Sequence, residues 1–126
     1  MAYLLERKAT QSTPYVLIDE KNHRMVLEGL SFHENTVEFF KALKEWLVEY
    51  LKTDFGTFTF ECGMTYFNSS TTKILYNMFG LMNDHASKNK EIIINWHINH
   101  QDDMLLELCE DFQEDYDNLI FNKIML

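Results

Sequence analysis

The sequence predicts an α/β fold: a small domain with a mixed β-sheet of about five strands, two long helices and a shorter helix near the C-terminus. Three patterns support this prediction. Apolar and polar residues alternate over residues 57–67, apolar residues recur every three or four positions on either side of that segment, and a β-branched run follows at 92–94. The 126 residues have room for one domain, 1–126, and for no second one.

A β-hairpin is expected near the N-terminus. The apolar segments 15–18 and 25–27 flank the polar stretch 19–24, whose Lys21-Asn22 pair suits a turn between two strands. We therefore expect these two strands to pair with each other in an antiparallel arrangement.

An amphipathic helix is expected next, over about Glu34 to Lys52, because its apolar residues recur at spacings of three and four. The period then changes to two between Thr57 and Phe67. This change predicts a strand with one buried face, which carries Phe58, Phe60, Cys62, Met64 and Tyr66.

A second helix follows, with apolar side chains at positions 74, 75, 78, 79 and 82, and it ends in the polar run 87–90. The unbroken run Ile92-Ile93-Ile94 predicts a central strand that is covered on both faces. A strand, a helix and a strand joined by short loops form a βαβ unit, whose strands are parallel. Apolar residues at 104–112 indicate a third helix, and residues 119–121 indicate a last short strand.

Composition and charge exclude several classes of function. The net charge is −9, and residues 91–126 hold Lys123 as their only Lys or Arg against nine Asp and Glu, so we expect no nucleic acid partner and favour basic partners. No segment reaches the roughly 18 apolar residues of a membrane span, and the first residues lack the apolar core of a signal peptide. We therefore expect a soluble, cytoplasmic protein with no membrane association.

Cys62 and Cys109, which have no Cys-x-x-Cys spacing, are expected to be reduced and packed.

Four consecutive hydroxyl residues, Ser69 to Thr72, follow Asn68 where the strand meets the second helix. The first N–H groups of a helix lack internal partners and the helix dipole is positive there, so a phosphate on one of these hydroxyls would be stabilised. Lys73, one turn after Ser69, lies near enough to pair with such a phosphate. The same residue types are also the preferred N-caps, and spacing alone favours a cap with no further role.

The segment Tyr66 to Lys73 resembles a motif of the SiaC-type regulatory phosphoprotein family, in which a strand ends in a Tyr-Phe-Asn-Thr-Ser-Ser-x-Lys-like sequence that opens a helix. The likeness extends over nearly the whole chain. The further segments that carry it are Thr10 to Asp19 with Thr13-Pro14, Gly29 to Asn35, Trp96 with Asp102-Asp103-Met104, and Glu110-Asp111-Phe112.

The resemblance implies a STAS-like fold, similar to that of anti-anti-sigma factors, and a non-catalytic role as a phosphorylation-controlled switch. It places the phosphoacceptor at Ser69, directly after the motif Asn68, with Ser70 as the alternative. Asn68, Ser70, Thr71 and Lys73 are then expected to form the phosphosite and the partner-binding surface. This chain has Ser69 where the family often has Thr, which keeps a hydroxyl at the position.

The family also implies three protein partners. The unphosphorylated form is expected to bind and activate a diguanylate cyclase, which raises cyclic di-GMP and favours biofilm formation. A histidine-kinase-like Ser/Thr kinase would add the phosphate, and a PP2C-type phosphatase would remove it. No cofactor is expected.

Two alternative functions stay open at the level of sequence. One is an anti-anti-sigma factor that sequesters an anti-sigma kinase, and the other is a small protein that binds an anion or another ligand at the strand-to-helix turn. His97 and His100 precede Asp102-Asp103 and invite comparison with metal ligands. On a strand, however, residues three apart leave on opposite faces, so no metal site is expected. No nucleophile, glycine-rich phosphate loop or patterned His/Ser/Asp set accompanies the acidic pair, so no catalytic residue is expected either.

Overall fold

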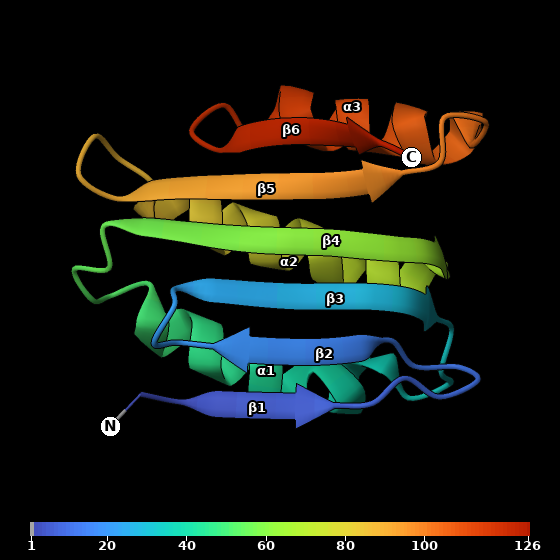
Figure 1. Cartoon of the computed structure of the whole chain (residues 1–126), viewed down its shortest axis with the longest axis horizontal. Helices are drawn as coiled ribbons and strands as arrows, with labels where there is room; N and C mark the ends of the chain where they lie inside the picture. Colours follow the sequence, from blue (N-terminus) through green and yellow to red (C-terminus); the bar gives the residue numbers. More distant parts are fainter. Residues whose placement is uncertain (1) are drawn as a thin grey trace.

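The computed structural model describes residues 2–126, which form one six-stranded sheet with three helices (Figure 1). The strands lie side by side in the order of the sequence. The first three strands pair antiparallel with their neighbours, and the third to the sixth strands pair parallel, so the third strand belongs to both groups. The predicted mixed α/β sheet is therefore confirmed. The strands are β1 (Leu4–Arg7), β2 (Tyr15–Asp19), β3 (Arg24–Ser31), β4 (Thr57–Phe67), β5 (Glu91–Ile98) and β6 (Ile120–Met125).

Each helix connects two neighbouring parallel strands, and all three lie on the same side of the sheet in Figure 1. They are α1 (Thr36–Tyr50), α2 (Ser69–His85) and α3 (Asp103–Asp115). Because the carboxyl ends of parallel strands meet at one edge, the N-termini of the three helices gather along that edge, which is on the right in Figure 1. No helix among residues 2–126 has both the length and the apolar character needed to span a bilayer.

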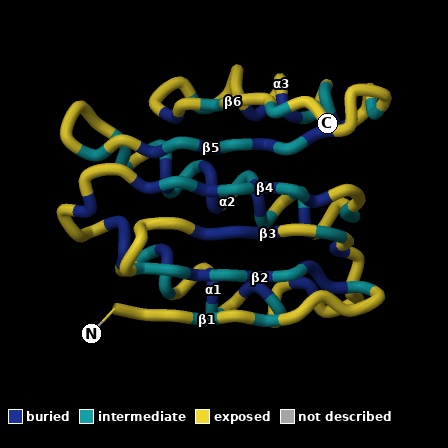
Figure 2. Tube along the Cα trace, viewed as in Figure 1, coloured by how far each residue is buried: buried dark blue, intermediate teal, exposed yellow. Residues whose placement is uncertain are grey.

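The sheet has about one strand more than the sequence predicts. The additional strand, β1, is a short edge strand with no buried residue, whose positions alternate between exposed and half-buried (Figure 2). The sequence of β1, Leu-Leu-Glu-Arg, has no alternation of apolar and polar residues by which a strand could be detected. Leu4 is accordingly 71% exposed. The last strand is also longer than the predicted 119–121, since Ile120–Met125 pairs along most of β5.

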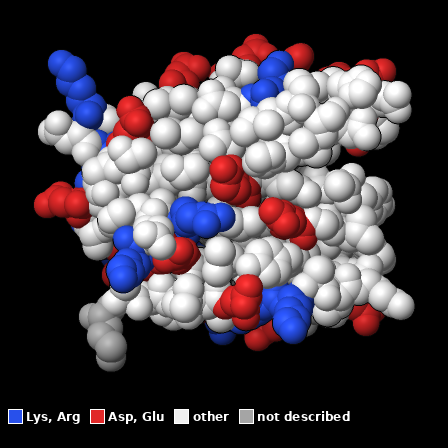
Figure 3. Space-filling view, viewed as in Figure 1, with Lys and Arg blue, Asp and Glu red and all other residues white. Residues whose placement is uncertain are grey.

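The prediction that β5 is covered on both faces is wrong. Its burial alternates, with Ile92 and Ile94 buried and Ile93 only half-buried, because helices cover one face and leave the other open. The open face carries a hydrogen-bonded polar row in which Glu61 accepts from Asn95 Nδ2 at 3.2 Å. Figure 3, viewed onto this face, shows scattered charges of both signs on a largely uncharged surface.

The core lies between the sheet and the helices, and it holds α2 in place through aromatic packing. Phe79 of α2 contacts Phe60 of β4, Trp96 of β5 and Phe112 of α3, with ring centroids 4.9–6.1 Å apart. The two cysteines are buried free thiols, as predicted. Burial raises the pKa of Cys62 to about 12, which keeps the thiol protonated at neutral pH.

Candidate functional site

The start of α2 is attached to the end of β3 as well as to its own strand. Asn68 N donates to the carbonyl of Ser31 at 3.0 Å, and the Thr71 hydroxyl lies 2.8 Å from the Ser31 hydroxyl. Ser31 and Thr71 are 2% and 0% exposed, so this contact is internal. A buried hydrogen bond between two strand ends and a helix fixes the direction in which α2 leaves the sheet.

Asn68 is the N-cap of α2, as the spacing of residues suggests. Its backbone is extended, and its Oδ1 accepts from both the N–H and the hydroxyl of Thr71, each at 3.0 Å. The carbonyl of Asn68 accepts from the N–H and the hydroxyl of Thr72, at 3.0 and 3.2 Å. The capping interpretation therefore accounts for Asn68, Thr71 and Thr72, whose polar groups are used within the fold.

Capping does not account for Ser69 and Ser70, which are both exposed. They are the first two residues of α2, so their N–H groups have no carbonyl one turn earlier to bind. The first turn of α2 contains no acidic side chain, whereas α1 has Glu38 and α3 has Asp103 in that position. An anion attached to either serine would meet the positive end of the helix dipole without an acidic neighbour in that turn.

The helical period separates the two serines by about 100° around the axis of α2. Ser69 lies on the same stripe of α2 as Lys73, four residues later. This stripe faces away from the side of the helix that carries the buried residues. Ser70 lies on the stripe of Ile74 and Asn77, which faces α1. Lys73 is exposed and stands three or four residues from both serines, within the range at which helical side chains pair.

The structure thus divides the five predicted site residues into two groups. Ser69, Ser70 and Lys73 are on the surface, where an enzyme or partner has access to them. Asn68 is half-buried and Thr71 fully buried, so both position the helix start from within. The hydroxyl of Thr71 is already bonded to Ser31 and Asn68, which leaves it no direct contact with a partner.

An exposed aromatic pair next to the site was not predicted from the sequence. Tyr66 was expected on the buried face of β4, but it is 57% exposed and packs edge-to-face on Phe32 with ring centroids 5.9 Å apart. The pairing of β3 with β4 shifts between Gly29 and Leu30, so Tyr66 leaves on the face opposite to Met64. The signal in the sequence was Gly29, whose φ of +105° is unfavourable for other residues.

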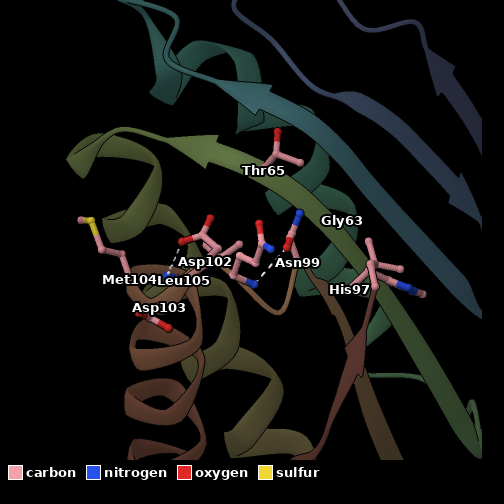
Figure 4. Close-up of a pocket in the computed structure, with 10 residues that line it drawn as sticks. Gly63, Thr65, His97, Asn99, Asp102, Asp103, Met104 and Leu105 are labelled. Carbon is pink, nitrogen blue, oxygen red and sulfur yellow. Dashed lines mark hydrogen bonds between the residues drawn. The ribbon is translucent and has the colours of Figure 1, made fainter.

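A hollow with a volume of about 710 Å³ lies at the same edge of the sheet, beside α3 and apart from the strand-to-helix turn that opens α2 (Figure 4). It lies between the end of β4, the loop after β5 and the first turn of α3. Its lining includes Asp102 and Asp103 but no Lys or Arg, so it does not suit an anion. Asp102 caps α3 by accepting from Leu105 N at 3.0 Å.

The two histidines that were considered as metal ligands each contact a different partner. His97 lies 3.2 Å from a carboxylate oxygen of Glu61 on the open face of the sheet, and His100 lies 2.8 Å from the carbonyl oxygen of Leu126. Within residues 2–126 no three His, Cys, Asp or Glu side chains come together as a set that could hold a metal ion.

Comparison with known proteins places this geometry in a family. A model of the SiaC family regulatory phosphoproteins matches residues 7–126. An uncharacterised protein of Pseudomonas aeruginosa (strain UCBPP-PA14) is 26% identical over 106 residues, 84% of either chain.

Two solved structures from Pseudomonas aeruginosa share the fold. Apo-SiaC has a TM-score of 0.88 at 24% identity, and the match covers 97% of this chain and 98% of that chain. A chain in the crystal structure of the diguanylate cyclase SiaD in complex with its activator SiaC has a TM-score of 0.90 at 24% identity, covering 97% and 99%. Since the family model covers nearly all of the sequence, the chain belongs to the SiaC family of regulatory phosphoproteins.

Proposed function

We propose that this chain is a non-catalytic switch that is phosphorylated on Ser69, with Ser70 as the alternative acceptor. In the unphosphorylated form the whole chain, 1–126, acts as one regulatory domain that binds and activates a diguanylate cyclase. A histidine-kinase-like Ser/Thr kinase adds the phosphate and a PP2C-type phosphatase removes it. The switch operates in the cytoplasm, a reducing compartment in which buried, unpaired thiols such as Cys62 and Cys109 are usual.

The observation that supports this proposal most directly is the exposure of Ser69 at a helix start whose structural side-chain hydrogen bonds are made by other residues. Asn68 and Thr71 satisfy each other and Ser31, so the Ser69 hydroxyl is not required by the fold. A kinase can therefore modify it without breaking a structural hydrogen bond. Membership of a family of regulatory phosphoproteins makes a surface hydroxyl the group to look for.

Phosphorylation at this position would change the charge of the surface while leaving the fold intact. A phosphate carries about −1.5 to −2 charges at pH 7, and it would lie at the positive end of α2 within reach of Lys73. The helix is therefore stabilised rather than melted. A partner that approaches the bare surface would meet a new dianion, and a few kcal/mol of repulsion and desolvation lowers affinity about a hundredfold or more.

The choice of a diguanylate cyclase as the partner is supported by one member of the same fold. SiaC of Pseudomonas aeruginosa is the activator of the diguanylate cyclase SiaD in their complex. The exposed pair Phe32 and Tyr66 lies at the same edge of the sheet as the start of α2 and gives that edge some of the apolar character that protein interfaces use at their centre.

The test compares Ser69→Ala and Ser69→Asp in binding to the cognate diguanylate cyclase and in the rate of cyclic di-GMP synthesis. Ser69→Ala should bind and activate whether or not the kinase is present, and Ser69→Asp should do neither. Ser70→Ala is the matched control, because it removes a neighbouring exposed hydroxyl and should still respond to the kinase. Phosphopeptide mass spectrometry after incubation with the kinase identifies the modified residue directly.

Equal binding by the alanine and aspartate variants would refute the switch at Ser69. A kinase response that survives Ser69→Ala and is lost with Ser70→Ala would move the acceptor to Ser70. No phosphorylation of either serine would remove the proposal.

A further inference from the structure

A groove of about 490 Å³ runs between α1 and α2 on the side of the helices that faces away from the sheet. Its apolar wall consists of Val37, Phe40, Val48 and Ile74. Val37 is 73% exposed, so part of this apolar wall is open to solvent. The floor of the groove is firm, because Phe40 is 2% exposed and belongs to the core.

The groove begins beside the proposed phosphosite. Ile74 and Asn77 line it from α2, and Ser70 precedes them by four and seven residues on the same stripe of that helix. Ser70 therefore stands at the entrance, one turn before Ile74. Along α1 the lining extends from Val37 to Glu49, a distance of about 18 Å at 1.5 Å per residue, which matches about three turns of another helix.

The sign of the charged residues that line the groove changes along α1. Lys41 and Lys44 lie in the half nearer to Ser70, and Glu45 and Glu49 follow toward the far end of α1. Lys73 adds a further positive charge beside the entrance. The groove lining in the half near Ser70 thus holds two lysines and no acid, although the chain as a whole carries a net charge of −9.

We propose that this groove is the docking surface for an amphipathic helix of the protein partner. The docked helix would place apolar side chains, spaced three and four residues apart, against Val37, Phe40 and Ile74. It would carry acidic residues at the end near Ser70 and basic residues at the other end, which complements the charges of α1. The inference rests on the proposed function, since it assigns a surface and a partner chemistry to the same switch.

This placement explains how one phosphate controls binding without a change of fold. A dianion on Ser70 lies about one turn before Ile74, and a dianion on either serine lies within pairing distance of Lys73. It would repel the acidic end of the docked helix and neutralise a lysine that attracts that end. Both effects lower affinity at the entrance, while the apolar wall stays as it was.

The decisive experiment compares two substitutions that are matched in local structure. Val37 is the second residue of α1 and is 73% exposed, and Met104 is the second residue of α3 and is 83% exposed. Aspartate is favourable in the first turn of either helix, so Val37→Asp and Met104→Asp should both fold. Met104 lines the other hollow at this edge of the sheet, and its substitution therefore tests the competing surface.

Affinity for the cognate diguanylate cyclase is measured by calorimetry with the unphosphorylated proteins, and circular dichroism confirms the fold of each variant. Val37→Asp should weaken binding by about tenfold or more, since it puts a charge into an apolar contact, and Met104→Asp should change it less than about twofold. Lys41→Glu should also weaken binding, whereas Lys8→Glu, which is exposed on a loop outside the groove, should not.

The outcomes separate this inference from the proposed function. If the unsubstituted chain binds the cyclase and Val37→Asp binds equally well, the groove is not the docking surface and the switch still stands. Loss of binding with Met104→Asp alone would move the interface to the other hollow and overturn the inference. If the unsubstituted chain does not bind the cyclase, the proposed function fails and the inference fails with it. If light scattering shows a dimer that Val37→Asp dissociates, the groove binds a second copy of this chain, which also overturns the inference.

Discussion

Replacing Asn68 by alanine tests whether the start of α2 is held as the structure indicates. The substitution removes the Oδ1 that accepts two hydrogen bonds, from the N–H and the hydroxyl of Thr71, each at 3.0 Å. The N–H would then depend on water, while the Thr71 hydroxyl would keep its contact with Ser31. We therefore expect a loss of global stability with a structural change that is confined to the first turn of α2.

The size of the effect follows from the lost contacts. An N-cap contributes about 1 kcal/mol, and the second, partly buried hydrogen bond raises the expected loss to about 1–2 kcal/mol. An unfolding entropy of about 2.1 cal/mol/K per residue corresponds to about 0.26 kcal/mol/K for 126 residues. Asn68→Ala should then lower the melting temperature by about 4–8 °C.

The other two helices provide an internal scale for this measurement. Asp102 caps α3 with a bond of 3.0 Å to Leu105 N, whereas Asn35 caps α1 with a longer bond of 3.4 Å to Glu38 N. Calorimetric melting of the three alanine variants should therefore give the smallest loss for Asn35→Ala. Asn68→Asp keeps the acceptor and should stay within about 0.5 kcal/mol of the unsubstituted protein.

Amide hydrogen exchange locates the change, because only Asn68→Ala should speed exchange at residues 69–72. A melting temperature within 1 °C of the unsubstituted protein, or an equal loss with Asn68→Asp, would contradict the proposed arrangement of bonds at the phosphosite.

Three further predictions concern the surroundings of this site. Ser31→Ala and Thr71→Val should show a coupling free energy of about 0.5–1.5 kcal/mol in a double-mutant cycle measured by urea unfolding, and strict additivity would mean that their hydroxyls do not interact. Burial raises the pKa of Cys62 to about 12 from 9.0, so only the unfolded chain loses this proton between these values. Stability should accordingly be complete below about pH 9 and fall as the pH rises toward 12, with a smaller slope for Cys62→Ala in urea titrations at several pH values. Gly29→Ala should cost about 1–2 kcal/mol of thermal stability, because φ is +105° there while the space for a Cβ is open, and a neutral result would show that the bulge relaxes.

The elements that could be predicted from sequence are those whose burial pattern is local. The strand at Thr57–Phe67 has the bounds that its alternation gives, because helices cover one face of β4 over most of its length. The helix at Thr36–Tyr50 lies within the predicted range for the same reason. In both cases neighbouring residues along the chain report directly which face is buried.

The elements that were missed depend on contacts between distant parts of the chain. The edge strand Leu4–Arg7 is defined by pairing with β2 and has little burial of its own. The run Ile92-Ile93-Ile94 gave no sign that one face of β5 is open, since isoleucine suits a half-buried position as well as a buried one. The exposure of Tyr66 depends on a shift in the pairing of two strands, which alternation along a single strand does not reveal.

Capping and phosphorylation need not compete within the hydroxyl cluster, because they involve different residues. Asn68 supplies the capping acceptor of α2, and it does so to Thr71. Since Thr71 must then face the sheet to reach Ser31, the helical period turns Ser69 and Ser70 outward. The two inner residues fix the helix, and for that reason the two outer ones are accessible at its positive end.

This division of roles constrains how the proposed switch would act. If the acceptor also capped the helix, its phosphorylation would alter the fold and couple signalling to stability. Here the residues that hold α2 are distinct from the residues that face the solvent, so the phosphorylated and bare forms should share one backbone structure. In the proposed switch, control would then reside in the surface charge near Lys73 and in the groove between α1 and α2, where a partner would meet either neutral hydroxyls or a dianion.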